Sequence, residues 1–326
     1  MITENLPYEA VKKKIAEYNS ITILSHLNPD ADALGTSLGI YALCLQEKDK
    51  KVEIVNASTA LPIHLDFLPN FKKIKHHMDY SDSLVISCDC GSVDRLGFNL
   101  EGRDILNIDH HQSNTNYGSV NAILPQYASS SQVAFELFRE LYTMNASAAT
   151  CFYTALLSDT RYFTTSSVNE KVFSVAQKLV SLGAKSDEIS FNLTQRRPLS
   201  SLRILEKALA SLALTNEAKV ATLMVSKEEI ASTGATIPDM EGIADYAKSL
   251  VTVEIALFAM ELEEGIRISL RSKNVDISQV AMAFDGGGHK MAAGFTLKEN
   301  ICKEGLQECV NKVLEKITEL GLVNET

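Results

Sequence analysis

Three features are scarce in this 326-residue sequence, and each scarcity argues against a class of protein. No apolar run approaches the roughly 20 residues that a membrane-spanning helix needs, so we expect no membrane association. Positive charge is outweighed, with 31 Lys and Arg against 41 Asp and Glu, which argues against a protein that coats long nucleic acid. The first twenty residues are polar with the spacing of an amphipathic helix, so we expect no signal peptide and a cytoplasmic location.

The cysteines also lack the arrangement of a structural zinc site. Cys88-Asp89-Cys90 is a C-x-C pair, but no second C-x-x-C or H-x-x-H pair accompanies it at zinc-binding spacing. The cysteines mostly lie in apolar runs, so we expect them to be reduced, buried side chains of a cytoplasmic protein. They are Cys44, Cys88, Cys90, Cys151, Cys302 and Cys309.

The composition that is present, 45% hydrophobic and 22% charged residues, is typical of a globular protein. Single cores stop growing at about 250–300 residues, so the length predicts two domains. In the first half, apolar runs rich in β-branched residues alternate with helical patterns. This predicts an α/β fold whose N-terminal domain is a mostly parallel sheet with helices on both faces. The strand patterns lie at 21–26, 51–58, 83–90 and 104–111, and the helical patterns at 33–48, 129–143, 146–158 and 168–182.

The periodic pattern weakens near 183–200 and then resumes. A smaller C-terminal α/β domain is predicted from strand patterns at 219–226, 253–262, 265–272 and 294–299 and helical patterns at 241–250, 275–284 and 301–319. We expect a first domain at 1–185, a connecting segment with a helix at 186–212 and a second domain at 213–326. The active-site cleft is expected between the two domains.

Three of the four predicted strands in the first half end in residue types that bind metal ions. Ligands of open α/β sheets bind outside the carboxyl ends of the strands, so these separate segments should converge on one place. The residues are His26, Asp30 and Asp32 after the first strand, Asp89 after the third, and Asp109-His110-His111 after the fourth.

Some of these residues also have ordinary interpretations. The segment after the first strand could be an Asx turn with Asp32 capping a helix at Ala33, although that leaves His26 unexplained. His76-His77 lies in a charged stretch and is predicted to be a solvated surface pair. Asp159 ends an apolar helical run, where the helix dipole disfavours a carboxylate, so a functional use would account for its position.

A mixed set of histidine and carboxylate ligands favours Mn²⁺, with Mg²⁺, Fe²⁺ or Co²⁺ as alternatives, over a thiolate zinc site. Two such ions about 3.5–4 Å apart can activate a water molecule and polarise a phosphoryl oxygen. Four aspartate ligands would balance the charge of two divalent ions, so cations elsewhere must attract an anionic substrate. The four are Asp30, Asp32, Asp89 and Asp159.

The second half contains candidates for that attraction. Arg271-Ser272 closes a predicted strand, and Arg271 can donate two hydrogen bonds to a phosphate. A glycine run followed by a histidine lets backbone N–H groups approach a phosphate closely, and the histidine can donate to its oxygens. This run is Gly286-Gly287-Gly288-His289.

Together these motifs resemble the DHH superfamily of phosphoesterases, with a DHHA1-type C-terminal domain, over nearly the whole chain. Four motifs of the first half and the glycine run of the second occur in the order typical of the family. They are Ser25–Thr36, Asp89–Gly97, Asp109–Asn114 continuing through Tyr117-Gly118 to Asn121, Ser158-Asp159-Thr160, and Gly286–His289.

The resemblance implies a role for each matching residue. Asp109 would orient the adjacent histidines, and His111 would contact the scissile phosphate or assist the leaving group. Asp89 would bridge two ions, one held with His26 and Asp30, the other with Asp32, His110 and Asp159. The substrate contacts implied are Arg271, Ser272, Gly286, Gly287, Gly288 and His289 at the far phosphate, together with Asn114 and Arg95.

A two-domain chain of this size is similar to the nanoRNase and pAp-phosphatase branch of the superfamily. Members degrade very short RNA, dephosphorylate 3′-phosphoadenosine 5′-phosphate (pAp), or hydrolyse pApA and sometimes cyclic di-AMP. The resemblance implies a metal-dependent hydrolase of such substrates, without long nucleic acid or a membrane as partner, and leaves homodimer formation open. The segment Glu241–Lys248 departs from the branch, where an Asn is expected near Asp245 and an Arg near Lys248, so substrate choice stays open.

Three other functions compete with this one. A manganese-dependent inorganic pyrophosphatase has a similar first domain, but its C-terminal domain lacks the glycine run and histidine. A RecJ-type exonuclease would need an additional OB-type domain and suits a less acidic chain. A non-catalytic nucleotide sensor would be expected to have lost metal-ligand residues, whereas all six are present here.

Overall fold

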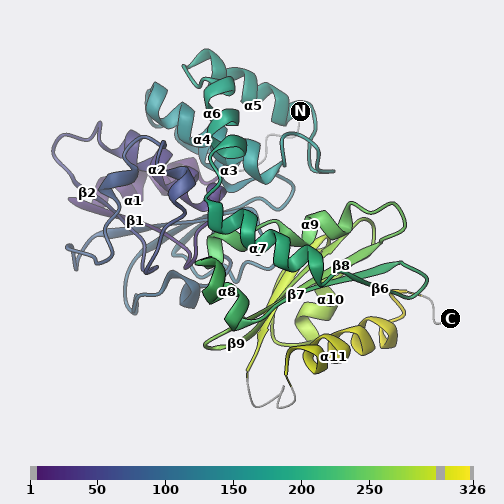
Figure 1. Cartoon of the computed structure of the whole chain (residues 1–326). Coiled ribbons are helices and arrows are strands. Elements are labelled where there is room, and N and C mark those ends of the chain that lie inside the picture. Colours follow the sequence, from purple (N-terminus) through teal and green to yellow (C-terminus); the bar gives the residue numbers. More distant parts are fainter. Residues whose placement is uncertain (1–5, 299–304, 324–326) are drawn as a thin grey trace. The chain divides into compact units, whose positions relative to one another are not determined.

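The computed structural model describes residues 6–298 and 305–323, which form two compact units divided between Arg196 and Arg197. Each unit has its own sheet (Figure 1). We call the residues up to Arg196 the N-terminal unit and those from Arg197 the C-terminal unit. Cys302 and the first residues of the helix predicted at 301–319 lie outside the described residues.

The N-terminal unit contains a sheet of five parallel strands in the order β2-β1-β3-β4-β5. The predicted parallel sheet is therefore confirmed. The fifth strand was missed in the sequence because only one of its four side chains is buried, so it has no apolar run. The strands are β1 (Ser20–Ser25), β2 (Lys51–Val55), β3 (Leu84–Cys88), β4 (Ile105–Asp109) and β5 (Val120–Ile123).

The strand register brings the ends of β1, β3 and β4 to the same edge of the sheet. Ser25 lies beside Cys88, and Cys88 lies beside Ile108. The residues that follow these positions, His26, Asp89 and Asp109, therefore emerge together. The geometry of parallel strands is thus what assembles the site.

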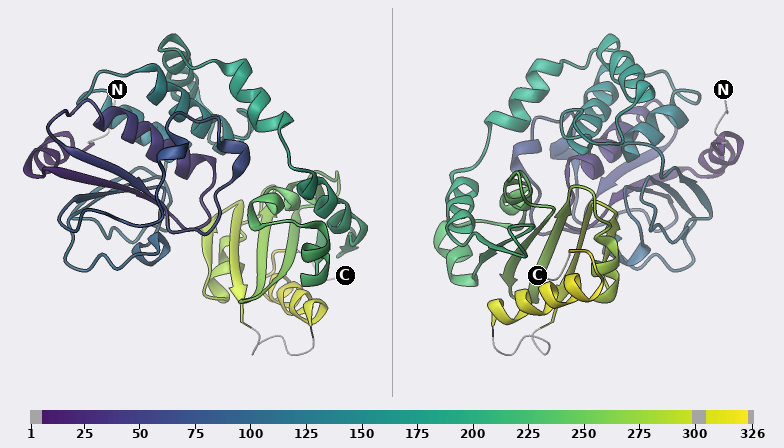
Figure 2. Two further views of the ribbon diagram at one scale, coloured as in Figure 1. Left: turned by 60° about the vertical axis from the view of Figure 1, so that its left-hand side comes forward. Right: turned by 90° about the vertical axis from the view of Figure 1, so that its right-hand side faces the viewer.

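Helices cover one face of this sheet, and α2 is sandwiched between the sheet and α4 (Figure 2). All fourteen residues of α2 are buried. Glycine at Gly39 permits the close approach, since a Cβ there would lie 2.3 Å from the ring of Phe152. The other face is covered by the 3₁₀ turn η3 (Val93–Leu96) and Leu100. The helices are α2 (Ala31–Cys44), α3 (Ser130–Phe138), α4 (Ala146–Asp159) and α5 (Glu170–Ser181), and α1 (Tyr8–Glu17) is tied to Asp104 through Lys14.

Two helices occupy the segment with weak periodicity. The first, α6 (Ser186–Gln195), has two acidic residues in its first turn, which favour the helix N-terminus. Its sequence has no clear amphipathic pattern, because only Ile189 is buried in this helix. The second, α7 (Leu199–Ala210), is the helix expected within 186–212. It packs on the C-terminal sheet through Ile204 and Ala208.

The C-terminal unit has a mixed six-stranded sheet in the order β10-β11-β9-β8-β7-β6, in which only β7 and β8 pair in parallel. One face packs against α10 and α11, and the other against α7, α9 and η4. The predicted second α/β fold is therefore confirmed. The strands are β6 (Ala213–Thr215), β7 (Val220–Val225), β8 (Ile255–Leu262), β9 (Gly265–Ser272), β10 (Gly287–His289) and β11 (Ala292–Leu297). The helices are α8 (Lys227–Thr233), η4 (Ile237–Met240), α9 (Ile243–Lys248), α10 (Ser278–Ala283) and α11 (Leu306–Glu319).

The cysteine prediction holds in part. Four of the residues, Cys44, Cys88, Cys90 and Cys151, are buried free thiols. Cys309, on α11, is instead disulfide-bonded. Among the described residues, every helix falls short of the length and apolar character needed to cross a bilayer.

Candidate metal centre

The turn after β1 supplies the first group of side chains. His26 is buried at the end of the strand, and Asp30 is the N-cap of α2, where its Oδ1 accepts a hydrogen bond from the Ala33 backbone N–H at 2.9 Å. The capping alternative for Asp32 is therefore wrong, because Asp30 does the capping. Asp32 lies in the first turn of α2 and is buried.

Asp89 lies at the centre of the cluster and has an unusual backbone. Its φ is +56°, in the left-handed region that Asp adopts more readily than most residues. Such a conformation costs about 1–3 kcal/mol and persists where the surrounding structure imposes it. The side chain is 2% exposed, so the sharp turn after β3 directs a carboxylate into the protein.

Two groups of side chains share this carboxylate. Oδ2 of Asp89 lies 3.8 Å from Nε2 of His26, and these two residues form one group with Asp30. Oδ1 of Asp89 lies 3.8 Å from Nε2 of His110, and these two form the other group with Asp32. The two oxygens of one carboxylate thus face two different sets of ligand atoms.

Asp159, the last residue of α4, joins the second group. Its Oδ2 lies 3.5 Å from Nε2 of His110, and Oδ2 of Asp32 lies 3.9 Å from the same nitrogen. Ligand atoms about 2.1 Å from one ion lie roughly 3.0–4.2 Å apart, depending on the angle between them. The observed separations fall within that range.

The electrostatics of the cluster also suit cations. Burial and the charge of neighbouring carboxylates raise the pKa of Asp32 and of Asp89 to about 7. The same causes raise the pKa of Asp159 to about 6. Four aspartates in so small a volume repel one another, and divalent cations would offset this repulsion. The residues present therefore fit a pair of divalent ions.

Backbone carbonyls fix the orientation of both histidine rings. Nδ1 of His26 lies 2.8 Å from the Leu27 carbonyl oxygen, and Nδ1 of His110 lies 3.1 Å from that of Tyr127. Because a carbonyl only accepts, Nδ1 carries the proton in each contact. Nε2 of each ring is then the nitrogen turned towards the carboxylates, which is the usual arrangement of metal-binding histidines.

Asp109 and His111 form a tightly bonded pair beside the cluster. Nδ1 of His111 lies 2.7 Å from Oδ1 of Asp109, which also accepts from the His110 backbone N–H at 2.7 Å. Burial opposes ionisation of Asp109, but the hydrogen bond and charge of His111 outweigh it and lower the pKa of this carboxyl to about 2. Burial would lower the pKa of His111, but Asp109 and Asp89 raise it to about 10.

Several polar residues that hold the cluster were missed in the sequence. Backbone N–H groups of Ser130 and Ser131, at the start of α3, donate to the carboxylate of Asp32 at 2.7 and 3.1 Å. The Ser130 hydroxyl donates to Asp89 at 2.8 Å. After β2, Asn56 donates through Nδ2 to the His26 carbonyl at 2.9 Å. For Ser130 and Ser131, the sequence does contain one indication, the run Ser129-Ser130-Ser131, which is typical of the start of a helix.

Two predicted substrate contacts in the N-terminal unit occupy different environments. Asn114 is buried and donates through Nδ2 to Oδ2 of Asp109 at 2.6 Å, so its amide supports Asp109 from inside the protein. Arg95 is exposed on η3, and its carbonyl accepts from the Leu27 N–H at 2.8 Å. The arginine side chain is accessible, whereas the asparagine side chain is engaged internally.

The predicted substrate contacts of the C-terminal unit lie at the end of β9 and in and just before β10, two strands that flank β11 on either side. Nη1 of Arg271, on β9, donates to the Leu270 carbonyl at 2.9 Å, and its Nε lies 3.6 Å from Oδ2 of Asp245. Ser272 is 2% exposed, and its hydroxyl donates to the Val275 carbonyl at 2.5 Å. The glycine run is not a loop throughout, because Gly287–His289 forms β10 and pairs with β11.

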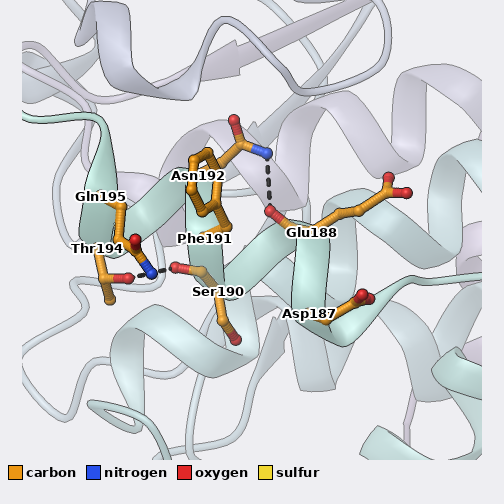
Figure 3. Close-up of a pocket in the computed structure, with 7 residues that line it drawn as sticks. All are labelled: Asp187, Glu188, Ser190, Phe191, Asn192, Thr194 and Gln195. Atoms are coloured by element: carbon orange, nitrogen blue, oxygen red, sulfur yellow. Dashed lines mark hydrogen bonds between the residues drawn. The ribbon is translucent and has the colours of Figure 1, made fainter.

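A separate hollow of about 670 Å³ lies along α6 (Figure 3). It is lined by Phe191 and by polar side chains, two of which bond back to their own helix, Asn192 to the Glu188 carbonyl and Thr194 to the Ser190 carbonyl, both at 2.7 Å. None of the residues predicted for the site lines this hollow. The candidate metal-binding residues after β1, β3 and β4 lie at the strand ends instead.

Comparisons with known proteins identify both domains of the chain. Residues 20–156 match the model of the DHH family, N-terminal domain, and residues 214–320 match that of the DHHA1 domain. The chain is 30% identical to the bifunctional oligoribonuclease and PAP phosphatase NrnA of Thermus thermophilus, over 92% of this chain and 91% of the relative. It is 25% identical to the protein of the same name from Bacillus subtilis, over 90% and 97%.

A solved structure has the same fold along its whole length. The crystal structure of an exopolyphosphatase-related protein from Bacteroides fragilis aligns with a TM-score of 0.84 at 26% sequence identity. The alignment covers 98% of this chain and 99% of that one. The chain therefore belongs to the DHH family of phosphoesterases, with a C-terminal DHHA1 domain.

Proposed function

We propose that this enzyme is a metal-dependent phosphodiesterase and phosphatase that acts on short oligoribonucleotides, on dinucleotides such as pApA, and on pAp or cyclic di-AMP. The observation that carries the proposal is the Asp89 carboxylate, whose two oxygens face two groups of buried ligand atoms. The two relatives named as oligoribonuclease and PAP phosphatase support the substrate class.

Six residues would hold two divalent ions, with Mn²⁺ as the proposed metal. Asp89 would contribute to both sites, His26 and Asp30 to one, and Asp32, His110 and Asp159 to the other. Ions bound there would supply a water molecule of lowered pKa and would neutralise charge on the phosphoryl group. The protein itself holds the Asp32 carboxylate in place, since this carboxylate accepts hydrogen bonds from two backbone N–H groups at the start of α3.

His111 is proposed to supply the proton that the leaving oxygen needs. Asp109 holds Nδ1 of this ring at 2.7 Å, which orients the imidazole and stabilises its protonated form. Asn114 fixes the other oxygen of Asp109 at 2.6 Å. An oriented general acid of this kind typically contributes about 10²–10⁴-fold to a rate.

The C-terminal unit is proposed to bind the phosphate that is not cleaved. Arg271 and Ser272 end β9, and His289 ends β10. Asp245 lies 3.6 Å from Arg271 and 2.9 Å from Lys248, so a carboxylate already stands near both cations. Affinity for an anionic substrate would depend on this balance of charge.

The proposal is tested with protein that has been stripped of metal by a chelator and supplied again with Mn²⁺. The substrates are pAp, pApA, cyclic di-AMP, longer RNA and pyrophosphate. Hydrolysis of pAp or of a dinucleotide supports the proposal. Cleavage of pyrophosphate alone would overturn it in favour of a pyrophosphatase, and bound Mn²⁺ without any hydrolysis would favour a nucleotide sensor.

Variants then test the assignment of Asp89. Asp89→Ala should lose activity on every substrate, because one carboxylate is proposed to serve both ions. Asp82→Ala is the matched control, since Asp82 is an exposed carboxylate just before β3 and its loss should leave activity unchanged. Full activity of Asp89→Ala would refute the assignment.

A further inference from the structure

Ser130 contacts three of the carboxylates that surround the candidate metal centre. Its backbone N–H donates to Oδ2 of Asp32 at 2.7 Å, and its hydroxyl donates to Oδ1 of Asp89 at 2.8 Å. The hydroxyl also lies 3.3 Å from Oδ1 of Asp109. The residue is fully buried at the first position of α3. A hydroxyl has one proton, so the shorter contact with Asp89 takes most of it.

The contact with Asp89 falls on one particular oxygen. Oδ1 is the oxygen near Nε2 of His110, at 3.8 Å, whereas Oδ2 lies 3.8 Å from Nε2 of His26. The hydrogen bond from the Ser130 hydroxyl to Oδ1 therefore opposes rotation of the Asp89 carboxylate about its Cβ–Cγ bond. Each oxygen is then kept facing its own group of ligand atoms.

We propose that the Ser130 hydroxyl is a positioning group that fixes the Asp89 carboxylate so that its two oxygens serve two metal ions. Ser130 acts through Asp89 and is not itself a ligand. The inference rests on the proposed function for the presence of two ions. Hydrogen-bond partners of metal-binding carboxylates typically change metal affinity by about 10–100-fold when they are removed.

The test is Mn²⁺ binding by Ser130→Ala, measured in the absence of substrate. Chelated full-length protein is titrated with Mn²⁺, and the free ion is counted by electron paramagnetic resonance. The substitution keeps the backbone N–H that bonds to Asp32, so it removes only the hydroxyl. The expected result is a dissociation constant raised about 10–100-fold for the ion on the Asp32 and His110 side, with the other ion less affected.

Ser37→Ala is the matched control. Ser37 is also fully buried, but its hydroxyl donates to the Ala33 carbonyl of its own helix at 2.7 Å. Its loss should leave both dissociation constants unchanged. Excess Mn²⁺ should restore the turnover of Ser130→Ala. Because bound Mn²⁺ also stabilises a folded state, urea unfolding of the metal-free variant shows separately whether the substitution has loosened the fold. Ser130→Gly provides a second variant without the hydroxyl if the alanine variant does not fold.

The outcomes separate this inference from the proposed function. Wild-type Mn²⁺ affinity in folded Ser130→Ala would overturn the positioning role, while hydrolysis of pAp or pApA by the wild type would still stand. Absence of hydrolysis by the wild type would overturn the proposed function, and the metal titration would remain readable because it needs no substrate. Equal weakening of binding in Ser37→Ala would also overturn the positioning role.

Discussion

The close packing of α2 against α4 at Gly39 predicts that a larger residue at this position destabilises the protein. These two helices carry Asp32 in the first turn of one and Asp159 at the end of the other, so their separation sets part of the candidate metal centre. An added Cβ at Gly39 would lie 2.3 Å from Cε1 and 2.6 Å from Cδ1 of Phe152. Phe152 is fully buried, so its ring has little room to move.

Two opposing effects decide the size of the change in Gly39→Ala. Alanine is favoured over glycine within a helix by about 1 kcal/mol, whereas forcing an extra carbon into a packed core typically costs about 1–3 kcal/mol. A contact this short belongs at the upper end of the overpacking range. After the gain from alanine is subtracted, we expect a net loss of about 1–2 kcal/mol in the free energy of unfolding. For a unit of this size the melting temperature should fall by about 2–8 °C.

Urea unfolding followed by circular dichroism measures this loss, and Mn²⁺ titration should show weaker binding. The control is a double-mutant cycle with Phe152→Leu, which opens space beside the new methyl group. Leucine at 152 should make the alanine less costly than it is in the wild-type background. An unchanged or raised unfolding midpoint in Gly39→Ala would refute the packing argument.

Two further predictions concern pH. Burial and neighbouring charges raise the pKa of Asp32 and Asp89 to about 7, above the roughly 3.9 of an unfolded Asp, so the folded state binds more protons between these values. Chelated protein should therefore lose stability as pH rises from about 4 to 7, and a pH series of urea midpoints that stayed flat would contradict this. Hydrogen bonds from Lys14 and Tyr18 instead lower the pKa of Asp104 to about 2. Asp104→Asn should cost up to about 1 kcal/mol at pH 7, and urea midpoints should show the difference disappearing as pH falls from about 4 to 2.

The strand ends were predictable from the sequence because parallel pairing leaves little freedom. Buried strands that end in His26, Asp89 and Asp109 must present these residues at one edge of a sheet. The apolar pattern of α4 likewise fixed Asp159 at the end of a helix. These positions depend on periodicity and strand direction, which one sequence contains.

Other features depend on contacts between distant segments and were missed for that reason. Ser130 meets Asp89 only because α3 begins beside the sheet edge, and no spacing in the sequence encodes that contact. The strand Gly287–His289 has no β-forming side chains. It exists because it pairs with β11, where a Cβ at Gly288 would lie 2.5 Å from the Ala292 carbonyl oxygen.

One buried cluster is proposed to bind two divalent ions through the shared carboxylate of Asp89. The most direct measurement is the number of Mn²⁺ ions bound per chain by the chelated wild type and by Asp89→Ala, determined by equilibrium dialysis without substrate. We expect two ions in the wild type and a marked loss of affinity for both in the variant. A wild type that binds one ion or none, or a variant that still binds two with wild-type affinity, would contradict the account.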